Sequence, residues 1–296
     1  MMPFVSIVIP TFNRRSTLEH VLPLLAKQTY PADRYEILLS DSGSTDGTQE
    51  MVEAMGIPNL RFISGENKGR SGARNRGVQG AKGEIVLFTD ADILADEGLV
   101  EAHARAHMAE TGICMVGCEV QVDTLDEYNH VKDHPEARRH LHGDKAKGTS
   151  WLFFLTGNAS ARRDDLIEVG MFDEGFTGYG HEDLELGYRL RKKGLRIRYN
   201  PAALNYHWHP VSFDERCSRK ELSGISTVRF YRKHNDPRIK LLLGVNPLTV
   251  FLHGFVSPQG RVLRYCRKRT GTSGFCRDVV LQFHYLAGVK RAQAGE

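Results

Sequence analysis

The chain has 296 residues, of which 26% are charged and 41% hydrophobic, a composition typical of globular proteins that excludes a disordered or fibrous chain. Its formal charge of +4 is unevenly divided, because residues 1–210 carry −6 and residues 211–296 carry +10. This asymmetry predicts two domains, 1–210 and a basic region 211–296, and it does not favour nucleic-acid binding by the chain as a whole.

Strands and helices are expected to alternate through the first third of the chain. Short apolar runs predict strands over 4–10, 35–40, 60–64 and 84–89. The segments between them predict helices over 16–28, 48–55 and 72–80. This alternation is typical of an α/β fold, in which helices cover both faces of a mostly parallel central sheet.

The alternation weakens beyond residue 113. A strand is expected over 113–122, followed by an exposed, polar and histidine-rich loop over 123–150. Helices are expected over 215–233 and 278–290, so region 211–296 is predicted to be a mainly helical C-terminal extension.

The sequence disfavours a secreted, a membrane-spanning or a disulfide-linked protein. The N-terminal residues lack a basic segment before an apolar core, so we expect no cleaved signal peptide. The longest apolar stretch, 241–256, is short for a membrane span and contains Pro247. The five cysteines lack Cys-x-x-Cys spacing, which disfavours a disulfide framework and fits a reducing cytoplasm. The predicted location is cytoplasmic.

Three polar clusters follow predicted strands, at 11–13, 41–46 and 90–92. Ligands of such sheets bind at the carboxyl ends of the strands, so the clusters predict one shared cleft. The cleft has neither the G-x-G-x-x-G pattern of a dehydrogenase nor a P-loop. Asp90 and Asp92 instead offer hard oxygen ligands suited to Mg²⁺ or Mn²⁺.

Six motifs stand in the order found in family 2 glycosyltransferases, which the chain resembles over residues 4–210. They are VSIVIPTFNR, DSGSTDGT, NKGRSGARNRG, LFTDAD, TGNASARR and FDEGFTGYGHEDLELGYRLRKKGLRIRYNP. The resemblance implies a GT-A fold, a nucleotide-diphosphate-sugar donor, a divalent Mn²⁺ or Mg²⁺ ion and inversion at the anomeric carbon. Asp41 resembles the uracil-binding carboxylate of uridine-using members, so a UDP-sugar is expected, although Ser42 replaces a second carboxylate common in the family.

The resemblance also implies roles for individual residues. Nucleotide binding falls to Pro10, Thr11, Asn13, Asp41, Asn67, Arg70, Arg74 and Asp90. Gly157, Asn158 and Gly180 are expected beside the donor or acceptor sugar. Asp90 and Asp92 are expected to bind the metal, with a histidine as third protein ligand. His207 and His209 are both candidates; we expect them to face opposite ways and favour His207.

Inversion requires a base that takes the proton of the acceptor hydroxyl as it attacks. The resemblance assigns this role to Asp183, with Glu182 assisting or binding the acceptor. Burial in a closed pocket can raise the pKa of such a carboxylate toward neutrality.

The acceptor is expected to be a hydroxyl of a glycan or a lipid-linked molecule, in the synthesis of a cell-envelope polysaccharide or glycoconjugate. Basic residues beside short apolar helices in 211–296 fit peripheral contact with the inner face of the cell membrane. Helices that expose their basic faces to solvent are an equal alternative. Two other functions stay open: a nucleotidyltransferase, and a nucleotide-sugar-binding protein without catalysis.

Overall fold

The computed structural model describes residues 2–138, 150–246, 249 and 260–295. The chain divides into two compact units, and a short segment of the second interrupts the first in sequence. The first unit comprises Met1–Gly175 and Glu182–Pro210, and the second comprises Phe176–His181 and Val211–Glu296.

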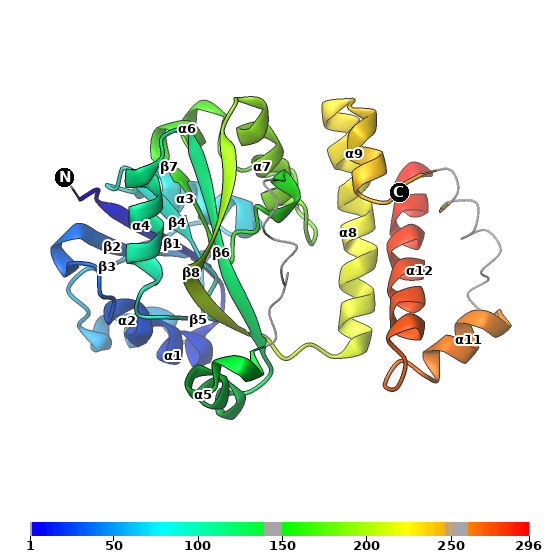
Figure 1. Cartoon of the computed structure of the whole chain (residues 1–296), viewed down its shortest axis with the longest axis horizontal. Coiled ribbons are helices and arrows are strands. Elements are labelled where there is room, and N and C mark those ends of the chain that lie inside the picture. Colours follow the sequence, from blue (N-terminus) through cyan, green and yellow to red (C-terminus); the bar gives the residue numbers. More distant parts are fainter. Residues whose placement is uncertain (1, 139–149, 247–248, 250–259, 296) are drawn as a thin grey trace. The chain divides into compact units, whose positions relative to one another are not determined.

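The first unit contains one eight-stranded sheet with the order β3-β2-β1-β4-β7-β6-β8-β5 (Figure 1). Strands β1 (Val5–Thr11), β2 (Tyr35–Asp41), β3 (Leu60–Ser64) and β4 (Ile85–Phe88) are mutually parallel, as expected. The other strands are β5 (Ile93–Ala95), β6 (Ile113–Val122), β7 (Ala159–Arg162) and β8 (Arg196–Trp208). Of these, β7 runs antiparallel to β4 and β6, and β5 runs antiparallel to β8 at the edge.

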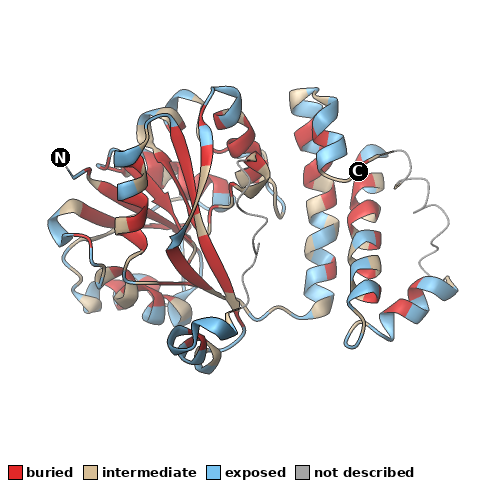
Figure 2. Cartoon of the chain, viewed as in Figure 1, coloured by how far each residue is buried: buried red, intermediate tan, exposed pale blue. Residues whose placement is uncertain are grey.

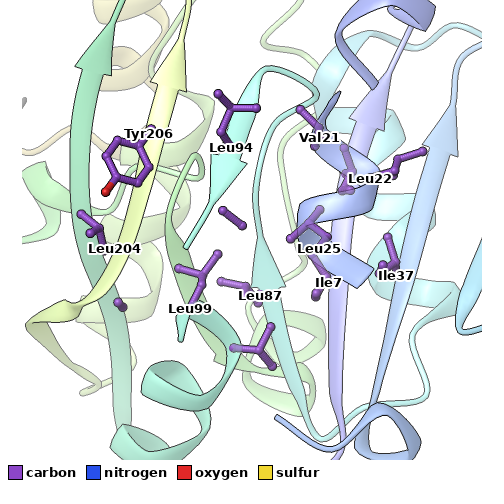
Figure 3. Close-up of a cluster of buried hydrophobic side chains, with 14 of the residues drawn as sticks. Ile7, Val21, Leu22, Leu25, Ile37, Leu87, Leu94, Leu99, Leu204 and Tyr206 are labelled. Carbon is purple, nitrogen blue, oxygen red and sulfur yellow. The ribbon is translucent and has the colours of Figure 1, made fainter. Parts of the chain in front are cut away.

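Strand β1 is buried on both faces because a helix covers each. Helix α1 (Arg15–Ala26) buries Leu18, Val21, Leu22 and Leu25, spaced as a helical stripe, against a core that includes Ile7 (Figure 3). The next residue, Val8, faces the other side and contacts helix α3 (Gly69–Gly80) at Gly77, where a Cβ would lie 2.3 Å from the valine. Strands β1, β2, β4 and β5 are buried along their whole length (Figure 2), and the expected α/β architecture with helices on both faces is confirmed.

Helices α4 (Leu99–Ala109) and α5 (Leu125–Asp133) occur where no helix was expected. In α5, Thr124 caps the first turn by accepting a hydrogen bond from the backbone N–H of Glu127 at 3.0 Å. The expected loop over 123–150 is therefore wrong for its first part, and residues 139–149 lie outside the described residues. The remaining helices of the unit are α2 (Thr48–Met55), α6 (Arg163–Glu168) and α7 (Glu182–Lys192).

The second unit is helical, with α8 (Phe213–His234) and α12 (Gly274–Gln293) side by side, and with α9 (Pro237–Leu242) and α11 (Arg261–Arg267) (Figure 1). The two long helices approach closely at glycines. A Cβ on Gly224 would lie 2.1 Å from the Tyr285 carbonyl, and one on Gly288 would lie 1.9 Å from the Glu221 carbonyl. No helix within the described residues has the length and hydrophobicity needed to cross a membrane.

Candidate active site

The loops after β1 and β2 are joined by hydrogen bonds at the carboxyl edge of the sheet. The backbone N–H of Asn13 donates to Ser44 Oγ at 2.8 Å, and Asn13 Oδ1 accepts from the N–H of Thr45 at 2.8 Å. Asn13 adopts a positive φ of 51°, which asparagine tolerates better than most residues. Two of the three predicted polar clusters are thus brought together.

The buried carboxylate of Asp41 organises the loop after β2. It accepts hydrogen bonds from the backbone N–H groups of Gly43 and Ser44, at 2.8 and 2.9 Å, and from the Ser44 hydroxyl. Asp46 instead accepts from the N–H groups of Arg15 and Thr48, at 3.0 and 3.2 Å, and so holds the start of α2.

Arg76 ties the end of β2 to the loop after β3, a role that was not predicted from the sequence. Its guanidinium donates to the carbonyl of Asp41 at 2.6 Å and to that of Glu66 at 2.8 Å. Nothing in the motif distinguishes Arg76 from Arg70 and Arg74, because only the fold shows which arginines face the strand ends. Asn67 accepts from the N–H of Gly69 at 3.1 Å, at the beginning of α3.

Arg74 connects two motifs that lie far apart in the sequence. Its guanidinium is only 2% exposed and donates to Asp90 Oδ1 at 2.8 Å and to Glu182 Oε1 at 3.1 Å. Burial lowers the pKa of Arg74, but the two carboxylates outweigh burial and keep it above its usual value. Arg74 was expected beside the nucleotide phosphates, and that role stays a prediction; the structure shows its pairing with two carboxylates.

Glu182 and Asp183 begin α7 and differ in their ionisation. Burial by itself raises the pKa of Glu182, but the cations Arg70 and Arg74 have the larger effect, so this pKa is below its usual value. Arg70 Nη2 lies 3.5 Å from Glu182 Oε1. Burial and the negative charge of Glu182 raise the pKa of Asp183 to about 7. The pair therefore combines a permanent anion with an acid that exchanges its proton near neutral pH.

Within the described residues, one group of three His, Cys, Asp or Glu side chains could hold a metal ion. It consists of Asp92, His207 and His209. His209 Nδ1 lies 2.8 Å from Asp92 Oδ2, and His207 Nε2 lies 3.6 Å from Asp92 Oδ1. The expectation that the two imidazoles face opposite ways is wrong, because residues two apart along a strand share a face. Strand β8 brings both to Asp92 by pairing His207 with Ile93.

Glu119 on β6 lies behind His207, with its Oε1 3.1 Å from Nδ1 of the imidazole. This buried carboxylate fits closely against Gly157, where a Cβ would lie 2.6 Å from Glu119 Oε2. Burial lowers the pKa of His207, but the neighbouring carboxylates of Asp92 and Glu119 raise it well above its usual value. The sequence analysis missed Glu119, because one acid in a β-strand carries no motif.

Three predicted site residues have contacts or positions that the sequence does not indicate. Asp90 pairs with Arg74 and is outside the group formed by Asp92 and the histidines. Asn158 is buried and directs its amide into the core, donating to the Cys118 and Ala203 carbonyls and lying 2.8 Å from His103 Nε2. Gly180, with a φ of 87°, belongs to the segment assigned to the second unit.

Several buried polar atoms of these motifs lack a hydrogen-bond partner within the described residues. They include Thr11 Oγ1 at the end of β1, Asp92 Oδ1, Glu182 Oε2 and His209 Nε2. A buried polar atom without a partner costs about 1–3 kcal/mol, so each of these atoms needs a partner from outside the chain, such as an ordered water, an ion or a ligand. One carboxylate and two imidazoles suit a divalent transition metal such as Mn²⁺, so the residues fit the metal that the sequence predicts.

Comparisons with known families support the resemblance. The sequence model described as "Glycosyl transferase family 2" matches residues 6–170, and that described as "N-terminal domain of galactosyltransferase" matches residues 144–210. Validoxylamine A glucosyltransferase of Streptomyces hygroscopicus subsp. jinggangensis is 31% identical, over 84% of this chain and 65% of that protein. Chondroitin synthase of Escherichia coli is 26% identical, over 84% of this chain and 42% of that protein. The chain thus spans less than two thirds of these curated relatives.

Solved structures give the fold. A mannosyltransferase from Pyrobaculum calidifontis, in complex with GDP-mannose and Mn²⁺, has a TM-score of 0.66 and 21% identity over 100% of this chain and 89% of its own. TarS 1–349 of S. aureus, in complex with UDP, has a TM-score of 0.58 and 18% identity over 99% of this chain and 92% of its own. Because the family model covers more than half of the sequence, the chain belongs to glycosyltransferase family 2, and it has the GT-A fold.

Proposed function

We propose that the chain is an inverting, metal-dependent glycosyltransferase that moves a sugar from a nucleotide diphosphate donor, a UDP-sugar, to a hydroxyl acceptor. One observation carries the proposal: buried Arg74 pairs with both Asp90 and Glu182. This arginine joins Asp90, which follows β4, to Glu182 at the start of α7. A donor-binding motif and a candidate base thereby come together.

Asp183 is the proposed base. Its pKa of about 7 leaves much of it ionised at neutral pH yet basic enough to accept a proton. In the transfer step, Asp183 takes the proton of the acceptor hydroxyl while the acceptor oxygen bonds to the anomeric carbon. The bond between that carbon and the diphosphate oxygen breaks on the opposite face, which inverts the configuration. Glu182 keeps Asp183 basic, and Arg74 with Arg70 keeps Glu182 ionised.

Asp92, His207 and His209 are the proposed metal ligands, and Glu119 is proposed to fix the orientation of His207. A bound Mn²⁺ or Mg²⁺ would stabilise the negative charge that develops on the departing diphosphate. Imidazole ligands favour Mn²⁺ over Mg²⁺. The Mn²⁺ complexes of the mannosyltransferase and of GalNAc-T7, two proteins with similar folds, support the choice.

The nucleotide is proposed to bind at the loops after β1 and β2, beside Thr11, Asn13 and Asp41. The hydroxyl of Thr11 is buried without a partner within the described residues, so it is available to a ligand. A UDP donor is favoured by Asp41 and by the UDP complexes of TarS and GalNAc-T7. The mannosyltransferase complex contains GDP-mannose, so an experiment must compare uridine and guanosine donors.

The acceptor is proposed to be a glycan or lipid-linked hydroxyl in the synthesis of a polysaccharide or glycoconjugate. Similarity to chondroitin synthase supports a polysaccharide. We extend the proposal to a cytoplasmic protein that contacts the cell membrane peripherally through residues 211–296.

A panel of nucleotide sugars tests the proposal. Each donor is incubated with Mn²⁺, and release of nucleoside diphosphate is measured with and without Asp183→Asn. We expect hydrolysis of one UDP-sugar, lost in the variant. Release of pyrophosphate from a nucleoside triphosphate would instead identify a nucleotidyltransferase. Donor binding without turnover, in the presence of acceptor, would identify a binding protein.

A further inference from the structure

Helix α11 and the turn that follows it carry a run of positive charge. Residues 260–277 contain six arginines and lysines and no aspartate or glutamate. Arg261, Lys268 and Arg269 are exposed, and none of the three pairs with an acidic side chain within the described residues. These cations are therefore open to an anionic surface rather than neutralised within the unit.

Large apolar side chains lie among these cations. Val262 is 60% exposed, Tyr265 is 54% exposed and Phe275, in the first turn of α12, is 76% exposed. Phe275 has the greatest exposure of any large apolar residue in the described part of the chain. We call these three residues, together with Arg261, Lys268 and Arg269, the α11 patch. Exposed apolar area of this kind marks an interaction surface when it is clustered rather than scattered.

The opposite side of α11 fixes the helix in place. Leu263 and Cys266 are buried in a cluster with Cys217, Cys276 and Val280 of the long helices. Because positions three apart share a helix face, this anchored side leaves Val262 and Tyr265 turned outward together. Figure 2 shows α11 mostly exposed, with buried residues confined to one side. The patch is thus held by the unit's own packing.

The cations and the exposed apolar side chains of the α11 patch together indicate which kind of partner it binds. An anionic polymer would engage only the cations and would leave three exposed apolar side chains without a role. An anionic lipid surface uses both, because apolar side chains enter the acyl boundary while arginines and lysines remain at the headgroups. The Arg269 guanidinium lies 4.7 Å above the Tyr265 ring, so cation and ring can occupy the headgroup level side by side.

We propose that the α11 patch is a lipid-binding site through which the second unit rests on a membrane rich in anionic phospholipid. Val262, Tyr265 and Phe275 insert at the interface, and Arg261, Lys268 and Arg269 contact the phosphates. This inference deepens the proposed function and rests on it only for its purpose, which is to bring the enzyme to a lipid-linked acceptor. Binding itself needs neither donor nor acceptor.

Vesicle sedimentation of the full chain tests the site. Vesicles of phosphatidylcholine alone are compared with vesicles that also contain phosphatidylglycerol, at low and high salt. We expect binding to the anionic vesicles only, weakened by salt. The variants Val262→Ser/Tyr265→Ser/Phe275→Ser and Arg261→Gln/Lys268→Gln/Arg269→Gln should each lower the partition coefficient about tenfold or more.

Matched variants of the first unit serve as controls. Met108→Ser/Ile167→Ser removes exposed apolar residues, and Lys82→Gln/Arg191→Gln/Lys192→Gln removes exposed cations; both should bind as the native chain does. Circular dichroism confirms that each variant folds. Absence of vesicle binding overturns the proposal, and so does a loss confined to the cation variant, which would indicate an anionic polymer. Donor hydrolysis without vesicles should be unchanged in the patch variants, so failure of this site is distinguishable from failure of the proposed transferase activity.

Discussion

The candidate active site has an Arg74 side and a histidine side, and the negative charge of the acidic residues is neutralised differently on each. Around Arg74 the cation is part of the chain, and Asp90 and Glu182 pair with it directly. Around Asp92 the partners are two imidazoles, which carry charge only when protonated and which coordinate metals when neutral. The Arg74 side therefore has its counter-charge within the chain, whereas the histidine side can take its counter-charge from a bound cation.

The difference explains why each acidic motif contains two acids. In the Asp90-Ala91-Asp92 motif, Asp90 joins Arg74 and Asp92 joins the histidines. In the second motif, Glu182 joins Arg74 and leaves Asp183 with a raised pKa. One acid of each pair thus anchors the site through the same arginine, and the other is available for chemistry.

The largest expected effect is loss of the base. Asp183→Asn should lower kcat by about 10³-fold, because an amide cannot take the acceptor proton. Donor affinity, measured by calorimetry with Mn²⁺, should stay within about twofold, since Asp183 is not expected to touch the nucleotide. Asp164→Asn, an exposed acid on α6, is the control and should leave kcat unchanged. Native kcat in Asp183→Asn would remove Asp183 from the mechanism.

Removal of the shared anchor should be costly to folding. Arg74→Met leaves Asp90 without this cation and the buried Glu182 with only Arg70, so the free energy of unfolding should fall by about 3–5 kcal/mol. The exposed pair of Arg105 with Glu101 supplies the control, and Arg105→Met should cost less than about 1 kcal/mol. Urea unfolding measures both. Equal losses would show that Arg74 does not anchor the two motifs.

How far the sequence predicts this site depends on the kind of signal each residue carries. The parallel strands β1 to β4 follow from apolar runs, and the meeting of their polar ends follows from topology. Asp92, with Asp90 and one of the two histidines, was expected to bind metal from the family resemblance, and the structure groups Asp92 with both histidines. The partner of Arg74 was not, because a buried ion pair between residues 108 apart in the chain leaves no local pattern.

The remaining differences between the sequence-based expectations and the structure arise from side-chain packing. Asn158 was expected beside a sugar, yet its hydrogen bonds join β6, β8 and α4 within the core. Helix α4 was missed because His103 and His107, polar residues by composition, occupy its buried face beside Ser160. A buried and hydrogen-bonded histidine interrupts the apolar stripe by which a helix is predicted.

The histidine side should be sensitive to Glu119. Glu119→Gln keeps the size of the side chain but loses its charge, so His207 becomes a weaker metal ligand. The affinity for Mn²⁺, measured by calorimetry without donor, should fall about 10–100-fold. Glu110→Gln, which removes a surface partner of Arg198, is the control and should bind Mn²⁺ normally. Unchanged affinity in Glu119→Gln would mean that Glu119 does not position His207.

The smallest expected effect is the pH dependence of the stability that Asp183 contributes. The pKa of Asp183 is raised from 3.8 to about 7, so the folded state binds this proton more tightly than the unfolded state does. Its contribution to stability is complete below pH 3.8, declines as the pH rises, and is lost above about 7. Asp183→Asn removes this dependence. The variant should therefore unfold a few degrees above the native chain at pH 8.5, and by less at pH 5.5. A difference in Tm that is the same at both pH values would show that Asp183 does not titrate near neutrality, and the kcat loss would then need a cause other than proton transfer.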